Sequence, residues 1–288
     1  MTVDPVALTV NSNTAIVGTV LSISADGNYL LISDPVGNVV NLYYISGSSI
    51  TLSQSVTTNA GAFTPDSRSV SFLVGQQLYY ETIFPSSVIT NLPYVPNSLD
   101  VSSTGSLTYI SSSASHAIDV RTTCNQADQQ TLAANNPTLV AHIPNGTGAV
   151  VADSPSIDIV NTGAIGPGCP PAPQSTVNSY SLNAGSFNAR QFLFATDSSR
   201  VWMISDLTSV IGFNLSALTP TAIPLADGAR AFSGGITVDG NTIYVGASDN
   251  TVHVLNTGSA TDTAQVAVGL KDSSSNPVAP NLVVVLSH

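Results

Sequence analysis

A set of polar residues recurs at turns that follow short apolar runs, and it is the group in this chain that could do chemistry together. The residues are Asp34, Gln76, His116, Asp153, Asp206 and Asp249. If these turns emerge on one face of the fold, around a central funnel, they would gather four carboxylates that are distant in sequence. Carboxylates suit hard cations such as calcium. An aspartate at a turn also commonly accepts hydrogen bonds from nearby backbone amides, and this structural interpretation stands beside the functional one.

Other catalytic and cofactor signals are missing from the sequence. It contains no G-x-S-x-G elbow, no Walker A or dinucleotide motif and no EF-hand loop. His142 could line a central channel, whereas His253, in the middle of an apolar run, is predicted to be structural. We therefore assign no catalytic residue and no cofactor, and we leave any metal unknown. Without a contiguous ligand loop, we expect at most a small effect of calcium on the melting temperature.

The two cysteines, Cys124 and Cys169, do not form a zinc motif, which needs about four ligands. They are either two buried thiols or a disulfide. Cys169 lies in the segment GPGCPPAP, which offers little apolar cover and favours the disulfide. A disulfide would indicate an oxidising compartment.

The turns belong to a repeated unit whose clearest copy is TVDGNTIYVGASDNTVHVLNTG, from Thr237 to Gly258. Equivalent turn positions are Asp26, Asp66, Thr104, Thr147, Asp197 and Asp239, spaced about 38 to 50 residues apart. This period is typical of propeller blades with four strands each. We predict one all-β domain over residues 1–288, a propeller of six four-stranded blades, with seven as the alternative. Pairing of the end strands, 7–10 with 282–286, would close the ring.

Composition agrees with an all-β fold and excludes some partners. Charged residues make up only 8% of the chain, and the net charge is −11. The few basic residues are scattered, whereas phosphate backbones require clustered Lys and Arg, so we expect no nucleic-acid partner. Apolar runs are far shorter than the roughly 20 residues of a membrane-spanning helix.

The repeat resembles the YVTN-type bacterial β-propeller repeats. The stretch VDGNTIYVGASDNTVHVLNTG is similar to that pattern, and SADGNYLLISDPVGNVVNLYYI follows it more loosely. The tetrapeptide itself is altered, to Tyr244-Val245-Gly246-Ala247. The resemblance implies an extracytoplasmic domain, secreted, periplasmic or on the cell surface, but no single chemistry.

Three functions remain open from the sequence. The favoured one is a non-enzymatic binding or cell-surface interaction module, a monomer with an unknown protein or carbohydrate ligand. The second is a propeller hydrolase or lyase, which requires His116 or His142 within hydrogen-bond reach of a funnel carboxylate. The third is a structural repeat domain of a larger secreted protein.

Overall fold

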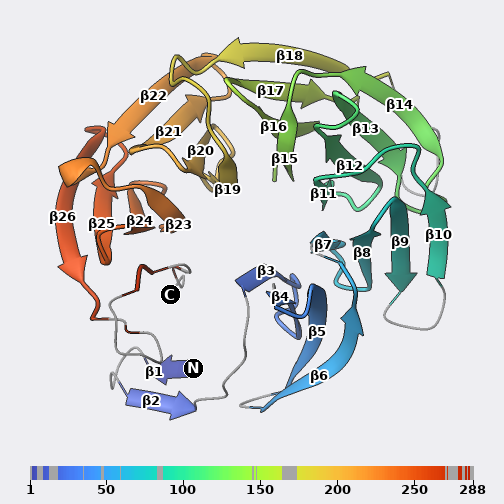
Figure 1. The fold of residues 1–288 in the computed structure, drawn as a ribbon, viewed down its shortest axis with the longest axis horizontal. Coiled ribbons are helices and arrows are strands. Elements are labelled where there is room, and N and C mark those ends of the chain that lie inside the picture. The colour runs from blue at the N-terminus through green and yellow to red at the C-terminus, as the bar shows by residue number, and fades with distance from the viewer. Residues whose placement is uncertain are drawn as a thin grey trace. The chain divides into compact units, whose positions relative to one another are not determined.

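A computed structural model of the chain shows strands almost throughout (Figure 1). It describes residues 2–4, 9–12, 19–34, 36–46, 49–58, 60–82, 87–144, 146, 148–163, 174–269, 271, 278–280, 283 and 285. The chain divides into two compact units, Met1–Val95 and Pro96–His288, and each is described by itself.

The first unit holds a short hairpin and two four-stranded sheets. The hairpin pairs β1 (Thr2–Asp4) with β2 (Thr9–Ser12). The first blade contains β3 (Thr19–Ile23), β4 (Tyr29–Asp34), β5 (Val39–Ser46) and β6 (Ser49–Val56). The second blade contains β7 (Ala60–Phe63), β8 (Ser69–Val74), β9 (Gln77–Thr82) and β10 (Ser87–Asn91).

The second unit holds four more sheets of the same kind. The third blade contains β11 (Ser98–Val101), β12 (Leu107–Ser112), β13 (Ala117–Thr122) and β14 (Asp128–Ala133). The fourth contains β15 (Pro137–His142), β16 (Gly148–Asp153), β17 (Ser156–Asn161) and β18 (Thr176–Ser181). The fifth contains β19 (Ala189–Phe194), β20 (Arg200–Ser205), β21 (Ser209–Asn214) and β22 (Thr219–Pro224). The sixth contains β23 (Ala231–Ile236), β24 (Thr242–Ala247), β25 (Thr251–Asn256) and β26 (Thr261–Ala267), preceded by a 3₁₀ turn, η1 (Ala226–Gly228).

Every blade is antiparallel, and its strands neighbour one another in chain order. In the second unit, the first strand of each blade lies on the inner side of an arc and the fourth strand on the outer side (Figure 1). The prediction of an all-β propeller with six four-stranded blades is confirmed.

A local turn motif explains why the first two strands of a blade form a hairpin. In the sixth blade, the Thr237 hydroxyl donates to Asp239 Oδ1 at 2.5 Å, and the Asn241 amide donates to the same oxygen at 3.1 Å. Gly240 follows with a φ of 70°, which favours glycine. Asp26 and Asp66 make the same contacts in the first two blades. A hydroxyl residue two positions before aspartate therefore encodes the turn.

The core of the second unit lies in the second and third strands of its blades. Trp202 of β20 is fully buried, and Val201, Met203 and Ile204 beside it are almost fully buried. The backbone of Gly212 in β21 lies directly against the indole, because a Cβ there would approach ring atoms to 2.5 Å. Glycine at this position therefore makes room for the largest side chain of the core.

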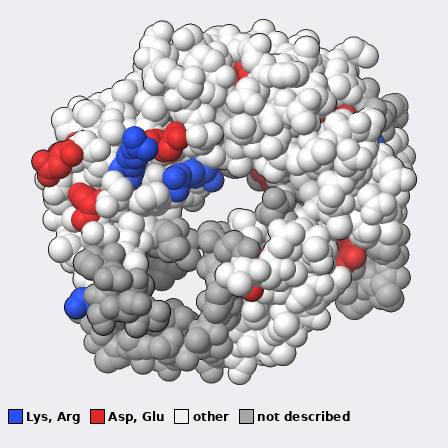
Figure 2. All heavy atoms as spheres, viewed as in Figure 1, with Lys and Arg blue, Asp and Glu red and all other residues white. Residues whose placement is uncertain are grey.

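The structure does not test the predicted closure of the ring by pairing of the two end strands. β2 pairs with β1 inside the first unit. Within the second unit, Val283 and Val285 lie against Gly235 of β23, but the rest of 282–286 falls outside the described residues. The single domain over 1–288 likewise stays a prediction. None of the described helical segments is long and apolar enough to cross a bilayer. Charged side chains are sparse on the face drawn in Figure 2.

Candidate functional site

Two of the predicted rim aspartates hold their own turns. Asp34, at the end of β4, accepts hydrogen bonds through Oδ1 from the amides of Val36 and Gly37, at 3.0 and 3.2 Å. Asp249, between β24 and β25, accepts from the amide and the hydroxyl of Thr251, at 3.2 and 2.9 Å. These contacts match the structural interpretation of aspartate at a turn.

Two other rim aspartates tie their turn to the residues just before the first strand of the same blade. Asp206 Oδ1 accepts from the Asn188 amide at 2.7 Å, and its Oδ2 accepts from the Asn188 side chain at 2.8 Å. These bonds keep the pKa of Asp206 below its usual value. Asp153, which is fully buried, accepts from the amides of Asn135 and Asn136. We call this contact the blade latch.

The remaining two rim residues are exposed and lie in different units. Gln76 contributes its backbone carbonyl, which accepts from the Leu92 amide at 2.7 Å. His116 has a φ of 53°, and its Nδ1 contacts the carbonyl oxygen of Asn135. His116 and Asp153 therefore meet through Asn135. Apart from this indirect contact, the described part of the second unit shows no hydrogen bond or ion pair between two rim residues. The rim residues of this unit are His116, Asp153, Asp206 and Asp249.

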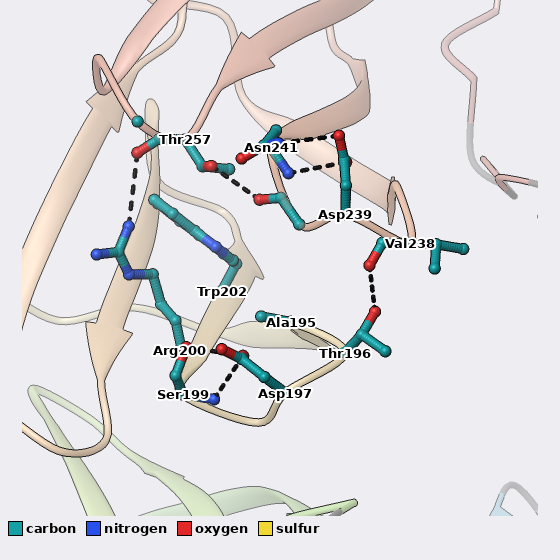
Figure 3. Close-up of a pocket in the computed structure, with 12 residues that line it drawn as sticks. Ala195, Thr196, Asp197, Ser199, Arg200, Trp202, Val238, Asp239, Asn241 and Thr257 are labelled. Carbon is teal, nitrogen blue, oxygen red and sulfur yellow. Dashed lines mark hydrogen bonds between the residues drawn. The ribbon is translucent and has the colours of Figure 1, made fainter.

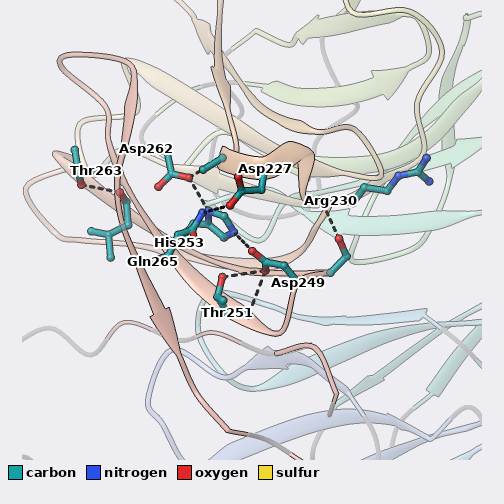
Figure 4. A network of polar contacts seen from close by, with 11 residues as sticks. Asp227, Arg230, Asp249, Thr251, His253, Asp262, Thr263 and Gln265 are labelled. Carbon is teal, nitrogen blue, oxygen red and sulfur yellow. Dashed lines mark hydrogen bonds and ion pairs between the residues drawn. The ribbon is translucent and has the colours of Figure 1, made fainter. Parts of the chain in front are cut away.

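The rim residue Asp249 also belongs to a buried network (Figure 4). The imidazole of His253 in β25 is fully buried, with Nε2 at 3.1 Å from Asp249 and Nδ1 at 2.6 Å from Asp262 in β26. Burial raises the pKa of Asp249, but the Thr251 hydrogen bonds and the nearby His253 outweigh it, so the pKa is lowered. Asp262 also accepts from the Ala226 amide at 2.9 Å. His253 thus bridges two acids and joins the outer strands, as its predicted structural role requires.

The position of His253, third in the third strand, is occupied by polar residues in most blades. The equivalent residues are Asn41, Tyr79, Asp119, Asp158, Ile211 and His253. In the third blade, Asp119 forms a buried ion pair with Arg121 at 2.7 Å. In the fourth blade, Asp158 lies diagonally across from Asp153 on the same face of the sheet.

Asp153 and Asp158 form a buried pair of acids. Asp158 is 1% exposed and hydrogen bonds with Ser179 and Asp153. Burial, supported by the charge of Asp153, raises the pKa of Asp158 to about 7, against the lowering effect of Ser179. Two carboxyl groups in contact repel each other when both are ionised, and the arrangement in which they share one proton is the more stable one.

An acid and a histidine also meet on the first strands. Asp100 of β11 accepts from the amide of His142 in β15, and Nδ1 of His142 lies 2.8 Å from the same oxygen. Burial lowers the pKa of His142, but the hydrogen bond and charge of Asp100 outweigh it and raise the pKa above 6.5. The pair resembles an oriented general base, because Nε2 of His142 makes no hydrogen bond within the described residues.

A polar cleft of about 370 Å³ opens between the fifth and sixth blades (Figure 3). The turns after β19 and β23 and the turn after β25 line it. Its main polar side chains are Asp197, Arg200, Asp239 and Asn241, and Trp202 lies at its base. The volume is within the range of small-molecule sites, and the cleft differs from most of them in its polar lining.

The cleft places an acceptor beside a donor. Arg200 lies over the Trp202 ring at 5.6 Å and makes one long hydrogen bond, from Nη1 to the Thr257 carbonyl at 3.5 Å. Ser199 occupies only Oδ1 of Asp197, through its amide and its hydroxyl. These bonds, with a smaller contribution from Arg200, lower the pKa of Asp197. The cleft therefore presents a carboxylate oxygen and guanidinium N–H groups that make no hydrogen bond with the described residues of the chain.

Cys124 follows β13 and is disulfide-bonded. Cys169, the only other cysteine in the sequence, lies outside the described residues. The pairing of the two therefore stays a prediction.

Sequence reasoning missed the residues that the structure brings together around these sites. They are Asp100, Asp158, Asp197, Arg200 and Asp262. A usable signal existed for Asp158, because the third position of the third strand is polar in most repeats. Asp197 was noted only as a turn marker, and nothing in one sequence indicates that its turn meets that of the next blade.

Comparison with known proteins supports the fold. No family model matches the chain, and no curated protein matches it. Among solved structures, the WD40 repeats of RRP9 align with a TM-score of 0.67 at 11% identity, over 88% of this chain and 82% of that one. A β-propeller domain of Cps50 (Swd1) from Myceliophteria thermophila aligns with a TM-score of 0.63 at 5% identity, over 91% and 90%.

A bacterial structure shows the same level of likeness. Hydrazine synthase of Kuenenia stuttgartiensis aligns with a TM-score of 0.58 at 15% identity, over 86% of this chain and 79% of that one. At such low identities the likeness concerns architecture only, since propellers host unrelated functions. This chain therefore has the β-propeller fold.

Proposed function

We propose that this chain is an extracytoplasmic bacterial propeller of the YVTN-repeat type that acts as a non-enzymatic binding module for a carbohydrate. The polar cleft carries the proposal, because Asp197 and Arg200 keep hydrogen-bonding capacity there that the fold does not use. Each saccharide hydroxyl both donates and accepts, so neighbouring hydroxyls match a carboxylate acceptor beside a guanidinium donor. The cleft volume of about 370 Å³ is suited to one or two sugar units.

Replacing Arg200 with glutamine tests this function. We expect the wild-type protein to bind members of a glycan array, and the Arg200→Gln variant to bind the same glycans about 10- to 100-fold more weakly, as for one lost charge-assisted hydrogen bond. Affinities would be measured by titration calorimetry on the array hits. Arg230→Gln is the control for loss of a positive charge, because Arg230 is an exposed arginine of the second unit that does not line the cleft, whereas Arg200 is half-buried in it. Binding that survives Arg200→Gln unchanged would contradict the proposal, as would an array without hits.

The extracytoplasmic location is supported by the disulfide at Cys124, since disulfides persist in oxidising compartments. We expect thiol titration of the denatured, unreduced protein to detect no free thiol. A link from Cys124 to Cys169 would close a loop of 45 residues, which the chain-entropy model values at about 4 kcal/mol of stability. Two reactive thiols in protein purified without reductant would contradict both the pairing and the location.

The hydrolase or lyase remains the second candidate, because His142 has a carboxylate partner, although this partner is Asp100 of β11 and not one of the predicted funnel carboxylates. His142 lies within hydrogen-bond reach of Asp100, and its Nε2 is available to accept a proton. His116 has no carboxylate partner among its described contacts. The binding module is preferred because the cleft offers an assembled set of donors and acceptors, whereas no nucleophile contacts His142 within the described residues.

A further inference from the structure

The buried acid pair of the fourth blade differs from its counterparts in how its charge is balanced. In the third blade, Arg121 neutralises Asp119 at 2.7 Å. In the sixth blade, His253 stands between Asp249 and Asp262. No basic side chain contacts Asp153 or Asp158 among the residues that the structure describes. The fourth blade thus has two acids in the layer where the third and sixth blades pair acids with a basic side chain.

A cavity of about 180 Å³ adjoins this pair. Besides Asp153 and Asp158, its polar lining consists of Asn135 and Ser179. Oδ1 of Asp158 is buried and accepts no hydrogen bond from the described residues. A buried oxygen without a partner is costly, so a group that supplies positive charge in the cavity would stabilise the fold.

We propose that this cavity binds a hard divalent cation, Ca²⁺ in the first instance, between Asp153 and Asp158. The two carboxylates supply the charge, and the hydroxyl oxygen of Ser179 is a neutral donor of the type that Ca²⁺ accepts in irregular geometry. Asn135, whose Nδ2 donates to Asp153 Oδ2 at 3.3 Å, would offer its side-chain oxygen after rotation of the amide. Asp153 is fixed for this role by the amides of Asn135 and Asn136. The cation would balance the acids of the fourth blade, as Arg121 does in the third blade and His253 in the sixth.

Thermal unfolding with added metal tests the proposal on the intact chain. The protein is stripped with EDTA, dialysed, and melted with increasing CaCl₂, MgCl₂ or NaCl at constant ionic strength. The sequence, which has no contiguous ligand loop, predicts at most a small calcium effect, and the buried acid pair changes that expectation. At a concentration about 100-fold above the dissociation constant, we expect Ca²⁺ to raise the melting temperature by roughly 5 °C, by mass action on the folded state. Mg²⁺ should act more weakly because it demands near-octahedral geometry.

Variants locate the effect. Asp158→Asn should abolish the calcium shift, and Asp158→Ser is the second variant should the first fail to fold. Asp206→Asn is the control and should keep the shift, because Asp206 holds a latch in another blade. No calcium or magnesium shift in the wild-type protein would overturn the proposal. An equal shift in Asp158→Asn or Asp158→Ser would place the cation elsewhere and would overturn it as well.

Discussion

In metal-free buffer at pH 8, the Asp158→Asn variant is expected to be more stable than the wild-type protein by up to about 4 kcal/mol. The pKa of Asp158 is raised from 3.8 to about 7 in the folded protein. Between these values the folded state retains a proton that the unfolded chain has lost. The free energy of unfolding therefore decreases as the pH rises from about 4 to about 7, and stays low above that range. Asparagine carries no charge and can donate to Asp153 as a protonated acid does.

Urea unfolding at pH 5 and pH 8, in the presence of EDTA, measures this difference. From pH 5 to pH 8 the free energy of unfolding should fall in the wild-type protein and change little in Asp158→Asn. Asp206→Asn is the control and should lower the free energy of unfolding instead of raising it. The pKa of Asp206 is lowered in the folded protein, which means that its ionised form stabilises the fold. If the wild-type protein is equally stable at both pH values, or if Asp158→Asn is destabilised at pH 8, the shared-proton description of the pair is wrong.

The His253→Ala variant is expected to lose about 3 kcal/mol or more of stability, because it leaves buried carboxyl oxygens without their hydrogen-bond partner. The imidazole is fully buried and contacts Asp249 and Asp262 at 3.1 and 2.6 Å. Without it, Asp262 keeps a buried carboxylate whose remaining contact is the Ala226 amide. The variant also leaves a cavity between β25 and β26, which adds to the loss.

The midpoint of urea unfolding at constant pH measures the loss. His116→Asn is the matched control, because His116 is an exposed turn residue with a φ of 53° that asparagine tolerates. Its stability should change by less than about 0.5 kcal/mol. A loss in His253→Ala as small as in this control would show that the network in Figure 4 does not hold the outer strands.

The fold was predictable because its signals are local. A hydroxyl residue, an aspartate two positions later and a turn recur in the first, second and sixth blades, and Thr237 and Asp239 show that these residues make the turn by direct hydrogen bonds. The strands between them follow from β-branched and aromatic runs. End-strand pairing involves distant parts of the chain, and no local signal specifies it.

The candidate sites were less predictable because they depend on register and on contacts between blades. The rim aspartates were recognised from their turns, but Asp153 gains a special environment only because register places Asp158 on the same face. The cleft forms where the turn of Asp197 meets the turn of Asp239 from the next blade. Neither relation can be seen in a linear sequence.

The blade latch has a consequence for how the chain reaches this fold. Asn135 and Asp153 are 18 residues apart, as are Asn188 and Asp206, whereas contacts between first strands, such as Val140 with Ser98, join residues 42 apart. Loop-closure entropy grows with the logarithm of the separation, so a latch costs about 0.7 kcal/mol less to close than such a contact between blades. Contacts of low sequence separation also favour fast folding. Two of the acids that look like a binding rim in the sequence, Asp153 and Asp206, thus serve as short-range closures. They lower the entropic barrier to forming the fourth and fifth blades before their neighbours are in place.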